Sequence, residues 1–334
     1  MKRCRIGNAE VAQIGLGCMN LSHAYGNPPE RAIAQRLLLR ALELGVDHFD
    51  TAALYGFGRN EELVGEVLAP ARGRIFLASK CGMTGIDGQR VLDGRPATLK
   101  QTCKEALHRL RTDVIDLYYL HRWDKRVPIE DSVGALADLV KEGHVRYIGL
   151  SEISVPTLLK AHAVHPISAV QSEFSLWSRS PEFGILEATR SIGAAFVAFS
   201  PLGRGFLADA IADPEEFVAH DFRRGMPRFS GSNFAANRRH LPALHALARE
   251  AGCTAPQLSL AWLLARAPHI LPIPGTTSVA HLEENWAAGD LSCPPGLLER
   301  VDELINPRTV SGLRYGATAL AEVDSDEAPG TPTP

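Results

Sequence analysis

Short apolar runs alternate with longer segments of helical periodicity from position 12 to position 305. A hairpin with Gly7 and Asn8 at its turn comes first, and a core strand over 12–17 follows it. Further apolar runs end near positions 50, 80, 121, 151, 172, 200 and 273, which makes eight predicted strands. Helical patterns cover 29–44, 60–68, 98–110, 129–141, 155–163, 181–191, 242–251, 255–267, 279–288 and 295–305. This alternation is typical of parallel βαβ units.

The polar residues at the strand ends favour a closed barrel over an open, doubly wound sheet. Asp50, Lys80, His121, Ser151 and Gln171 stand at the carboxyl ends of five successive strands. An open sheet gathers its active residues at one switch point, whereas a barrel brings all its strand ends to one mouth. We therefore predict an α/β fold, a single (β/α)8 TIM barrel with an N-terminal β-hairpin, as one domain over 1–323. The segment 201–240 is a long connection, and the acidic, proline-rich segment 324–334 is predicted to be a disordered tail.

The composition narrows the class of protein. The chain has 334 residues, 45% of them hydrophobic, and a formal net charge of −3. The absence of a basic excess argues against a nucleic-acid partner, and no apolar segment reaches membrane-spanning length. The six cysteines lack metal-ligand spacing, so we expect no metal and no disulfides. We therefore expect a cytoplasmic protein whose partner is a small molecule.

The side chains at the predicted mouth suit proton transfer to a carbonyl oxygen. Tyr55 lies on the small-residue loop just after Asp50. Its phenol has an ordinary pKa near 10, and a cation close by lowers that pKa. Lys80 supplies the cation, Asp50 holds it, and His121 orients the carbonyl oxygen. Because no serine or cysteine nucleophile with a base stands out, hydride is the natural attacker, and nicotinamide cofactors carry hydride.

Two loops suit the phosphates of such a cofactor. Gly203, Arg204 and Gly205 are a weak match to the dinucleotide fingerprint, but they follow strand seven, where barrels often bind phosphate. The segment 274–278 follows strand eight and opens a helix, whose free N–H groups suit a phosphate.

Motifs at 49–56, 60–65, 116–121, 149–151, 200–205 and 273–285 occur together and in order. On these motifs the chain resembles the aldo-keto reductase superfamily over positions 5–315. The branch with perakine-reductase-like and auxin-induced-protein-like members is the most similar.

The resemblance implies NADP(H)-dependent reduction of an aldehyde or ketone, with Tyr55 as general acid and Asp50, Lys80 and His121 completing a tetrad. It implies that Ser151 and Gln171 bind the nicotinamide carboxamide. Phe199 falls where many relatives stack a tyrosine on the nicotinamide. The other implied cofactor residues are Ser200, Pro201, Leu202, Gly203, Arg204, Gly205, Gly275, Thr276, Thr277, Ser278 and His281, with Glu284 and Asn285 at the adenine. Tyr25, Leu54 and Trp123 are the candidates for the substrate pocket.

Two positions depart from the family pattern. Glu152 stands where many members have an asparagine that reaches the carboxamide, so we leave it out of the candidate site. The segment 275–278 lacks the lysine or arginine that many relatives place against the 2′-phosphate of NADP. The hydroxyls of this segment, the helix N-terminus and His281 are the alternative groups for that phosphate, with Arg204 or an arginine of the loop 223–239 to assist. NADPH is favoured by the resemblance, and NADH stays open.

Two other functions stay open as well. One is an NAD-dependent sugar or alcohol dehydrogenase working in the oxidative direction. The other is a cofactor-binding regulatory subunit, since potassium-channel β-subunits resemble the same family. The sequence names neither the substrate nor the oligomeric state.

Overall fold

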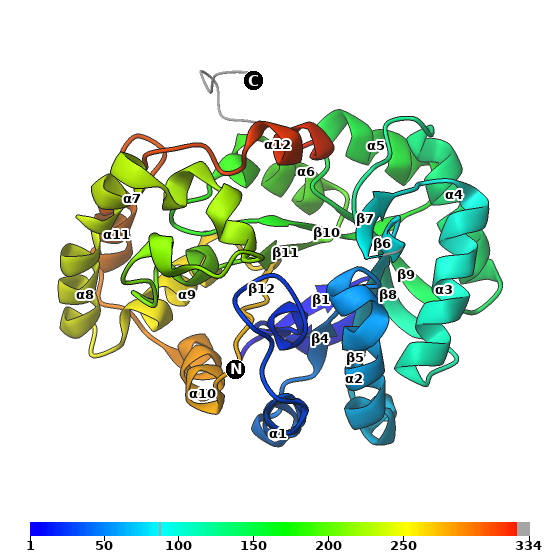
Figure 1. The fold of residues 1–334 in the computed structure, drawn as a ribbon, viewed down its shortest axis with the longest axis horizontal. Coiled ribbons are helices and arrows are strands. Elements are labelled where there is room, and N and C mark those ends of the chain that lie inside the picture. The colour runs from blue at the N-terminus through cyan, green and yellow to red at the C-terminus, as the bar shows by residue number, and fades with distance from the viewer. Residues whose placement is uncertain (87, 326–334) are drawn as a thin grey trace.

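Eight parallel strands form one sheet at the centre of the molecule, and helices surround it (Figure 1). The computed structural model describes residues 1–86 and 88–325. In sheet order the strands are β12 (Ile270–Pro272), β11 (Ala195–Phe199), β10 (Ile167–Glu173), β9 (Val145–Ser151), β8 (Ile115–Leu120), β5 (Phe76–Cys81), β4 (His48–Asp50) and β3 (Leu16–Gly17). The N–H of Gly15 donates to the carbonyl of Pro272 at 3.0 Å, and the N–H of Gly17 donates to that of Pro274 at 3.3 Å. The first and last strands thus meet, and the predicted (β/α)8 barrel is confirmed.

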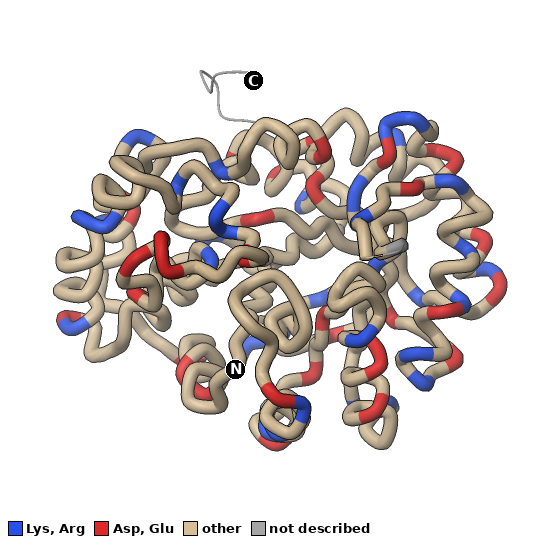
Figure 2. The backbone as a smooth tube through the Cα atoms, in the orientation of Figure 1, with Lys and Arg blue, Asp and Glu red and all other residues tan. Residues whose placement is uncertain are grey.

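The helices pack on the outside of the sheet, close to their predicted bounds. They are α1 (Arg31–Leu44), α2 (Arg59–Leu68), α3 (Pro96–Leu110), α4 (Ile129–Lys141), α5 (Val155–Val164), α6 (Ile185–Ser191), α8 (Leu241–Glu250), α9 (Ala255–Arg266), α10 (Val279–Ala287) and α11 (Leu297–Leu304). Acidic and basic residues are interspersed along α3 and α4 (Figure 2), and Lys100 pairs with Asp138 between these two helices. None of the helices in 1–86 and 88–325 has the length and apolar character to cross a membrane.

Some elements differ from the sequence-based prediction. The first core strand is shorter than 12–17, because Ala12 closes the hairpin strand β2 and leaves only β3 in the barrel. The structure also adds β6 (Met83–Ile86), β7 (Gln89–Leu92), α7 (Gly231–Arg238) and α12 (Ala317–Glu322). These additions span four to eight residues each, too few turns or alternations to give a clear periodic signal.

The strand alternation divides the barrel interior into an apolar and a polar half. Along β5, Phe76 and Ala78 point inward with other apolar residues, and Lys80 follows on the same face because side chains alternate with period two. The hairpin of β1 (Arg3–Ile6) and β2 (Ala9–Ala12) closes the apolar end, where Ile6 packs against these inward residues. The polar residues therefore gather at the opposite, carboxyl end of the strands.

The C-terminal segment is held to that carboxyl end. The ammonium of Lys125 donates to the carbonyl of Val323 at 2.9 Å. The carboxylate of Asp324 accepts from the N–H of Ser154 at 3.1 Å, and Ser325 bonds to Glu152. Asp324 and Ser325, the first two residues of the predicted tail, thus contact the barrel. Positions 326–334 lie outside the described residues.

Candidate active site

The four predicted tetrad residues meet at the carboxyl end of the barrel. The ammonium of Lys80 donates to a carboxylate oxygen of Asp50 and lies 3.3 Å from the phenol oxygen of Tyr55. It also donates to the carbonyl of Thr51 at 2.8 Å. The ring of His121 stands edge-on to that of Tyr55, with centroids 5.8 Å apart. All four tetrad side chains are buried, so an acid, a phenol, an ammonium and an imidazole lie together inside the barrel end.

The loop that carries Tyr55 is fixed by its own backbone and by a buried asparagine. Gly56 and Phe57 adopt left-handed φ angles of 57° and 55°, which turn the chain sharply into α2. Asn60, the second residue of α2, accepts from the hydroxyl of Thr51 at 2.6 Å and donates to the carbonyl of Cys18 at 2.8 Å. Because these bonds are buried, they hold the loop between β4 and α2 in one conformation.

Burial dominates the acidity of Tyr55. It raises the pKa of the phenol, while Lys80 lowers it without cancelling the effect of burial. The sequence-based expectation is right about the sign of the Lys80 effect and wrong about the net shift. Burial also lowers the pKa of Lys80, but Asp50 and Tyr55 outweigh it, so the pKa of Lys80 is raised. At neutral pH the site therefore holds a protonated phenol beside an ammonium.

His121 is neutral at neutral pH. Burial lowers its pKa well below the ordinary 6.5, and the positive charges of Arg122 and Lys80 lower it further. Its Nδ1 is buried and has no hydrogen-bond partner among residues 1–86 and 88–325. A neutral imidazole has one ring N–H, the kind of donor that can bond a carbonyl oxygen.

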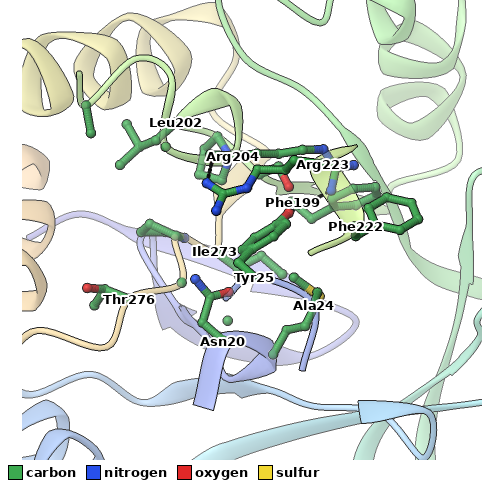
Figure 3. Close-up of a pocket in the computed structure, with 18 of the residues that line it drawn as sticks. Asn20, Ala24, Tyr25, Phe199, Leu202, Arg204, Phe222, Arg223, Ile273 and Thr276 are labelled. Atoms are coloured by element: carbon green, nitrogen blue, oxygen red, sulfur yellow. Dashed lines mark hydrogen bonds between the residues drawn. The ribbon is translucent and has the colours of Figure 1, made fainter. Parts of the chain in front are cut away.

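A cavity of about 1320 Å³ extends from the tetrad to the start of α10. Asn20 and Tyr25 of the loop after β3 face this common space, as do Phe199 at the end of β11 and Arg204 on the loop after it (Figure 3). The volume exceeds the roughly 300–1,000 Å³ of a usual small-molecule site. It leaves room for a dinucleotide and a substrate together.

Most predicted cofactor and substrate residues line this cavity. They are Tyr25, Leu54, Ser151, Gln171, Phe199, Ser200, Pro201, Leu202, Arg204, Gly205, Gly275, Thr276, Thr277, His281, Glu284 and Asn285. Gly203, Ser278 and Trp123 are not among the lining residues. The indole N–H of Trp123 donates instead to the carbonyl of Val127 at 2.8 Å, which fixes the ring to its own loop.

The far end of the cavity suits an anionic group. Thr276, Thr277 and His281 line it, and α10 begins there, with the Ser278 hydroxyl accepting from the N–H of His281. The N-terminus of a helix offers unpaired N–H groups and a partial positive charge. The donor set therefore fits a phosphate of the kind that a nicotinamide dinucleotide carries.

Arg249, near the end of α8, lines the cavity as well, together with Thr254 and Pro256 at the start of α9. Gln257 of α9 donates to the carbonyl of Glu284 in α10 at 3.1 Å, so these helices meet at the phosphate end. In residues 1–86 and 88–325, no acidic group pairs with Arg249. Sequence reasoning missed it because it looked for the cation in 275–278, at His281 and Arg204 and in the loop 223–239, whereas Arg249 comes from α8.

Arg204 has a different set of partners from the one predicted for it. Its buried guanidinium pairs with Glu173 of β10 and donates to the hydroxyls of Tyr25 at 2.7 Å and Tyr315 at 2.9 Å. These bonds join the loop after β11 to the loop after β3 and to the C-terminal segment. The predicted role of Arg204 as a free phosphate ligand therefore competes with a role in holding the rim together.

Glu152 and Arg122 are two further residues that the prediction leaves out. Glu152 is buried and forms a two-bond ion pair with Arg314, at 2.9 and 2.6 Å. Its φ is 54°, a left-handed angle that asparagine adopts more readily than glutamate. Arg122 lines the cavity beside His121, and its Nη1 donates to the His121 carbonyl at 2.6 Å and to the Ser151 hydroxyl at 3.0 Å. Its place directly after a predicted tetrad residue is the signal that points to it.

Comparison with known proteins gives a consistent result. The model of the Aldo/keto reductase family matches residues 13–306. A Schizosaccharomyces pombe protein, aldo-keto reductase yakc, described with NADP(+), is 40% identical over 332 residues, which cover 97% of this chain and 97% of that protein.

Solved structures agree with the fold. A glycerol dehydrogenase from Gluconobacter oxydans has a TM-score of 0.83 with 24% identity, covering 99% of both chains. An aldo/keto reductase from Klebsiella pneumoniae, in complex with NADP and acetate, has a TM-score of 0.73 with 27% identity. That match covers 94% of this chain and 99% of the other.

Proposed function

The chain belongs to the Aldo/keto reductase family and is an oxidoreductase of carbonyl and alcohol groups; from that premise we propose that it reduces an aldehyde or ketone with NADPH and that Tyr55 is the general acid. The observation that carries the proposal is the 3.3 Å contact between the Tyr55 phenol and the Lys80 ammonium, at a cavity that also holds the neutral imidazole of His121. A protonated phenol is in the right state to donate to a carbonyl oxygen.

When bound, NADPH supplies the hydride that attacks the carbonyl carbon. Tyr55 gives its proton to the carbonyl oxygen as negative charge develops there, so the product is an alcohol. Lys80 stabilises the phenolate that remains, and Asp50 keeps the ammonium in place. The free N–H of His121 donates to the same carbonyl oxygen and orients it. These charges act in a buried site, where preorganised electrostatic groups have their largest effect.

The cofactor would lie along the cavity with its nicotinamide at the tetrad. The amide nitrogen of Gln171 donates to Asp50 at 2.8 Å, which leaves the amide oxygen of Gln171 to accept from the carboxamide. The Ser151 hydroxyl accepts from Arg122, so its own hydrogen is directed to another acceptor. Phe199 offers a π-face. The phosphates would approach the start of α10, and Arg249 would meet the 2′-phosphate, in place of the basic residue missing from 275–278.

NADPH is favoured for two reasons. Arg249 and the N-terminus of α10 provide positive charge at the far end of the cavity. The Schizosaccharomyces pombe relative carries NADP(+) in its name, and the Klebsiella pneumoniae structure contains NADP. We extend both to this chain as part of the proposal. A cytoplasmic location is also part of it, supported by six cysteines that are all free, as is usual in reducing compartments.

An activity screen tests the proposal. Oxidation of NADPH and of NADH would be followed with a panel of aldehydes and ketones, and both dissociation constants would be measured by fluorescence quenching. We expect NADPH oxidation with at least one carbonyl compound. Preferred NADH binding with alcohol oxidation would point instead to an NAD-dependent dehydrogenase. Tight cofactor binding without turnover of any compound would point to a regulatory subunit like the potassium-channel β-subunits.

A further inference from the structure

We propose that Arg122 binds a carboxylate of the substrate, so that the preferred carbonyl compounds are acids with an apolar body. This inference rests on the proposed function, because it assigns a substrate class to the same cavity. It concerns the tetrad end, where Arg122 follows directly on His121.

One side of the Arg122 guanidinium is anchored and the other is free. Nη1 donates to the His121 carbonyl at 2.6 Å and to the Ser151 hydroxyl at 3.0 Å, which uses both of its hydrogens. Nε and Nη2 donate to no atom of the protein in residues 1–86 and 88–325. These two nitrogens form the edge of the guanidinium that binds a carboxylate through two parallel hydrogen bonds. The anchored side fixes the direction of the free edge.

Arg122 has no ion-pair partner in residues 1–86 and 88–325, unlike the arginines near it, although its charge acts from a distance on Glu152 and lowers the pKa of that carboxyl group. The other arginines at this end of the cavity have acidic partners: Arg90 pairs with Glu322, Arg204 with Glu173 and Arg223 with Asp221. For Arg122, no carboxylate of the described residues lies within ion-pair distance. A partly buried cation without a counterion is costly, and a substrate carboxylate would supply the counterion.

The positive charge of Arg122 reaches the reacting groups. It is among the charges that lower the pKa values of both His121 and Tyr55. Arg122 therefore lies close enough for one substrate to contact it and the tetrad at once. Leu54, Met19 and Met83 line the same region. They give an apolar wall for the part of the substrate between its carbonyl and its carboxylate.

Two aldehydes that differ in charge test this inference. The probes are 4-carboxybenzaldehyde and methyl 4-formylbenzoate, which share the ring and the para carbonyl substituent, compared at pH 7 with NADPH. We expect the wild-type protein to have a kcat/KM at least about tenfold higher for the acid than for the ester, the size usual for charge-assisted hydrogen bonds. Arg122→Met should remove this preference mainly by reducing the rate with the acid, and Arg122→Lys should keep part of it.

Arg239→Met is the matched control, because it also removes one arginine, and Arg239 is exposed and does not line the cavity. At saturating NADPH it should leave the ratio between acid and ester unchanged. An acid-to-ester ratio near one in the wild-type protein would overturn the inference. So would an equal loss with both aldehydes in Arg122→Met, since Arg122 would then act only by positioning Ser151. If either of these results came with turnover of the ester, the inference about Arg122 would fail but the proposed reductase function would stand. If no carbonyl compound were turned over, both the inference and the proposed function would lose their basis.

Discussion

The Lys80 ammonium lies 3.3 Å from the Tyr55 phenol oxygen, and the Lys80 side chain has no solvent-exposed surface. In such a setting the attraction between ammonium and phenolate is stronger than in water. Even so, burial leaves the pKa of Tyr55 raised. Tyr55 thus keeps its proton until negative charge appears on a substrate oxygen. The Lys80 ammonium therefore does not ionise Tyr55 beforehand, but it stabilises the phenolate that remains once Tyr55 has given up its proton.

Tyr55→Phe should abolish most of the turnover and leave cofactor affinity nearly unchanged. The substitution removes the proton donor but keeps the aromatic ring that contacts His121. We expect kcat to fall by about 10²- to 10⁴-fold, the usual contribution of a general acid. Steady-state kinetics and NADPH fluorescence quenching measure the two quantities. Equal losses of turnover and of NADPH affinity would mean that the phenol serves the cofactor site.

The pH profile of carbonyl reduction should extend far into the alkaline range. Tyr55 must be protonated to react, and its pKa lies above the ordinary value of 10.0. We therefore expect kcat/KM, which reports on the free enzyme, to show no decline from this group between pH 7 and 9. The His121 pKa is well below 6.5, so this residue gives no acidic limb near that pH. An alkaline limb centred near pH 8, absent from a Lys80→Met variant, would show that Lys80 outweighs burial.

The sequence predicts well where Asp50, Lys80 and His121 lie, because strand geometry alone brings these three together, while their catalytic roles stay predictions. Side chains two apart on β5 share a face, so Lys80 follows Phe76 and Ala78 into the interior. A closed barrel then places Asp50 and His121 at the same end. The same reasoning places Ser151 and Gln171, which line the cavity as well. Their roles toward a cofactor stay predictions.

Loop residues are predicted less well, because their direction depends on contacts that no periodicity records. Trp123 bonds to Val127 within its own loop and does not line the cavity. Arg204 lies on the predicted phosphate loop but pairs with Glu173. The pairing of Glu152 with Arg314 joins positions 162 apart in the sequence. A single sequence gives no sign of such a pair.

Arg314→Met should destabilise the protein strongly. It leaves the carboxylate of Glu152 buried without its partner, which typically costs about 3–5 kcal/mol. The double variant Glu152→Gln, Arg314→Met should recover much of this loss, because neither position then carries a buried charge. Urea unfolding monitored by circular dichroism measures both effects. If the double variant is no more stable than Arg314→Met, the pair does not act through buried charge.

The same pair gives a pH dependence of defined sign. Burial raises the pKa of Glu152, but the charges of Arg314 and Arg122 and the hydrogen bonds from Arg314 and Ser325 together outweigh it, so the pKa is lowered from 4.5 to about 2. Its contribution to the free energy of unfolding is therefore complete above about pH 4.5 and is lost as the pH falls toward 2. The Glu152→Gln, Arg314→Met variant should lose less stability over this window than the wild-type protein. Identical losses would show that Glu152 does not titrate in this way.

His48→Leu should reduce the fall in the free energy of unfolding between pH 7 and pH 5.5. His48 is fully buried, and neither ring nitrogen has a partner among residues 1–86 and 88–325. Burial lowers its pKa below 6.5, so below that pH the unfolded chain binds a proton that the folded protein does not. The free energy of unfolding then falls by up to about 1.4 kcal/mol per pH unit for this group. Urea titrations at pH 7 and 5.5 should show a smaller difference for His48→Leu; an unchanged difference would contradict the assignment.

Arg249→Met should weaken NADPH binding and leave NADH binding unchanged. The two cofactors differ only in the 2′-phosphate, and Arg249 is an arginine without an acidic partner in the described residues at the end of the cavity where α10 begins. We expect the dissociation constant of NADPH to rise about tenfold at low ionic strength and less at high salt, where exposed charges are screened. Arg239→Met is the control, since Arg239 is exposed and does not line the cavity. Fluorescence titrations of the wild-type protein and both variants with each cofactor give the six dissociation constants. If the dissociation constants of NADPH and NADH rose by the same factor, Arg249 would not contact the 2′-phosphate. It would then not replace the basic residue that 275–278 lacks.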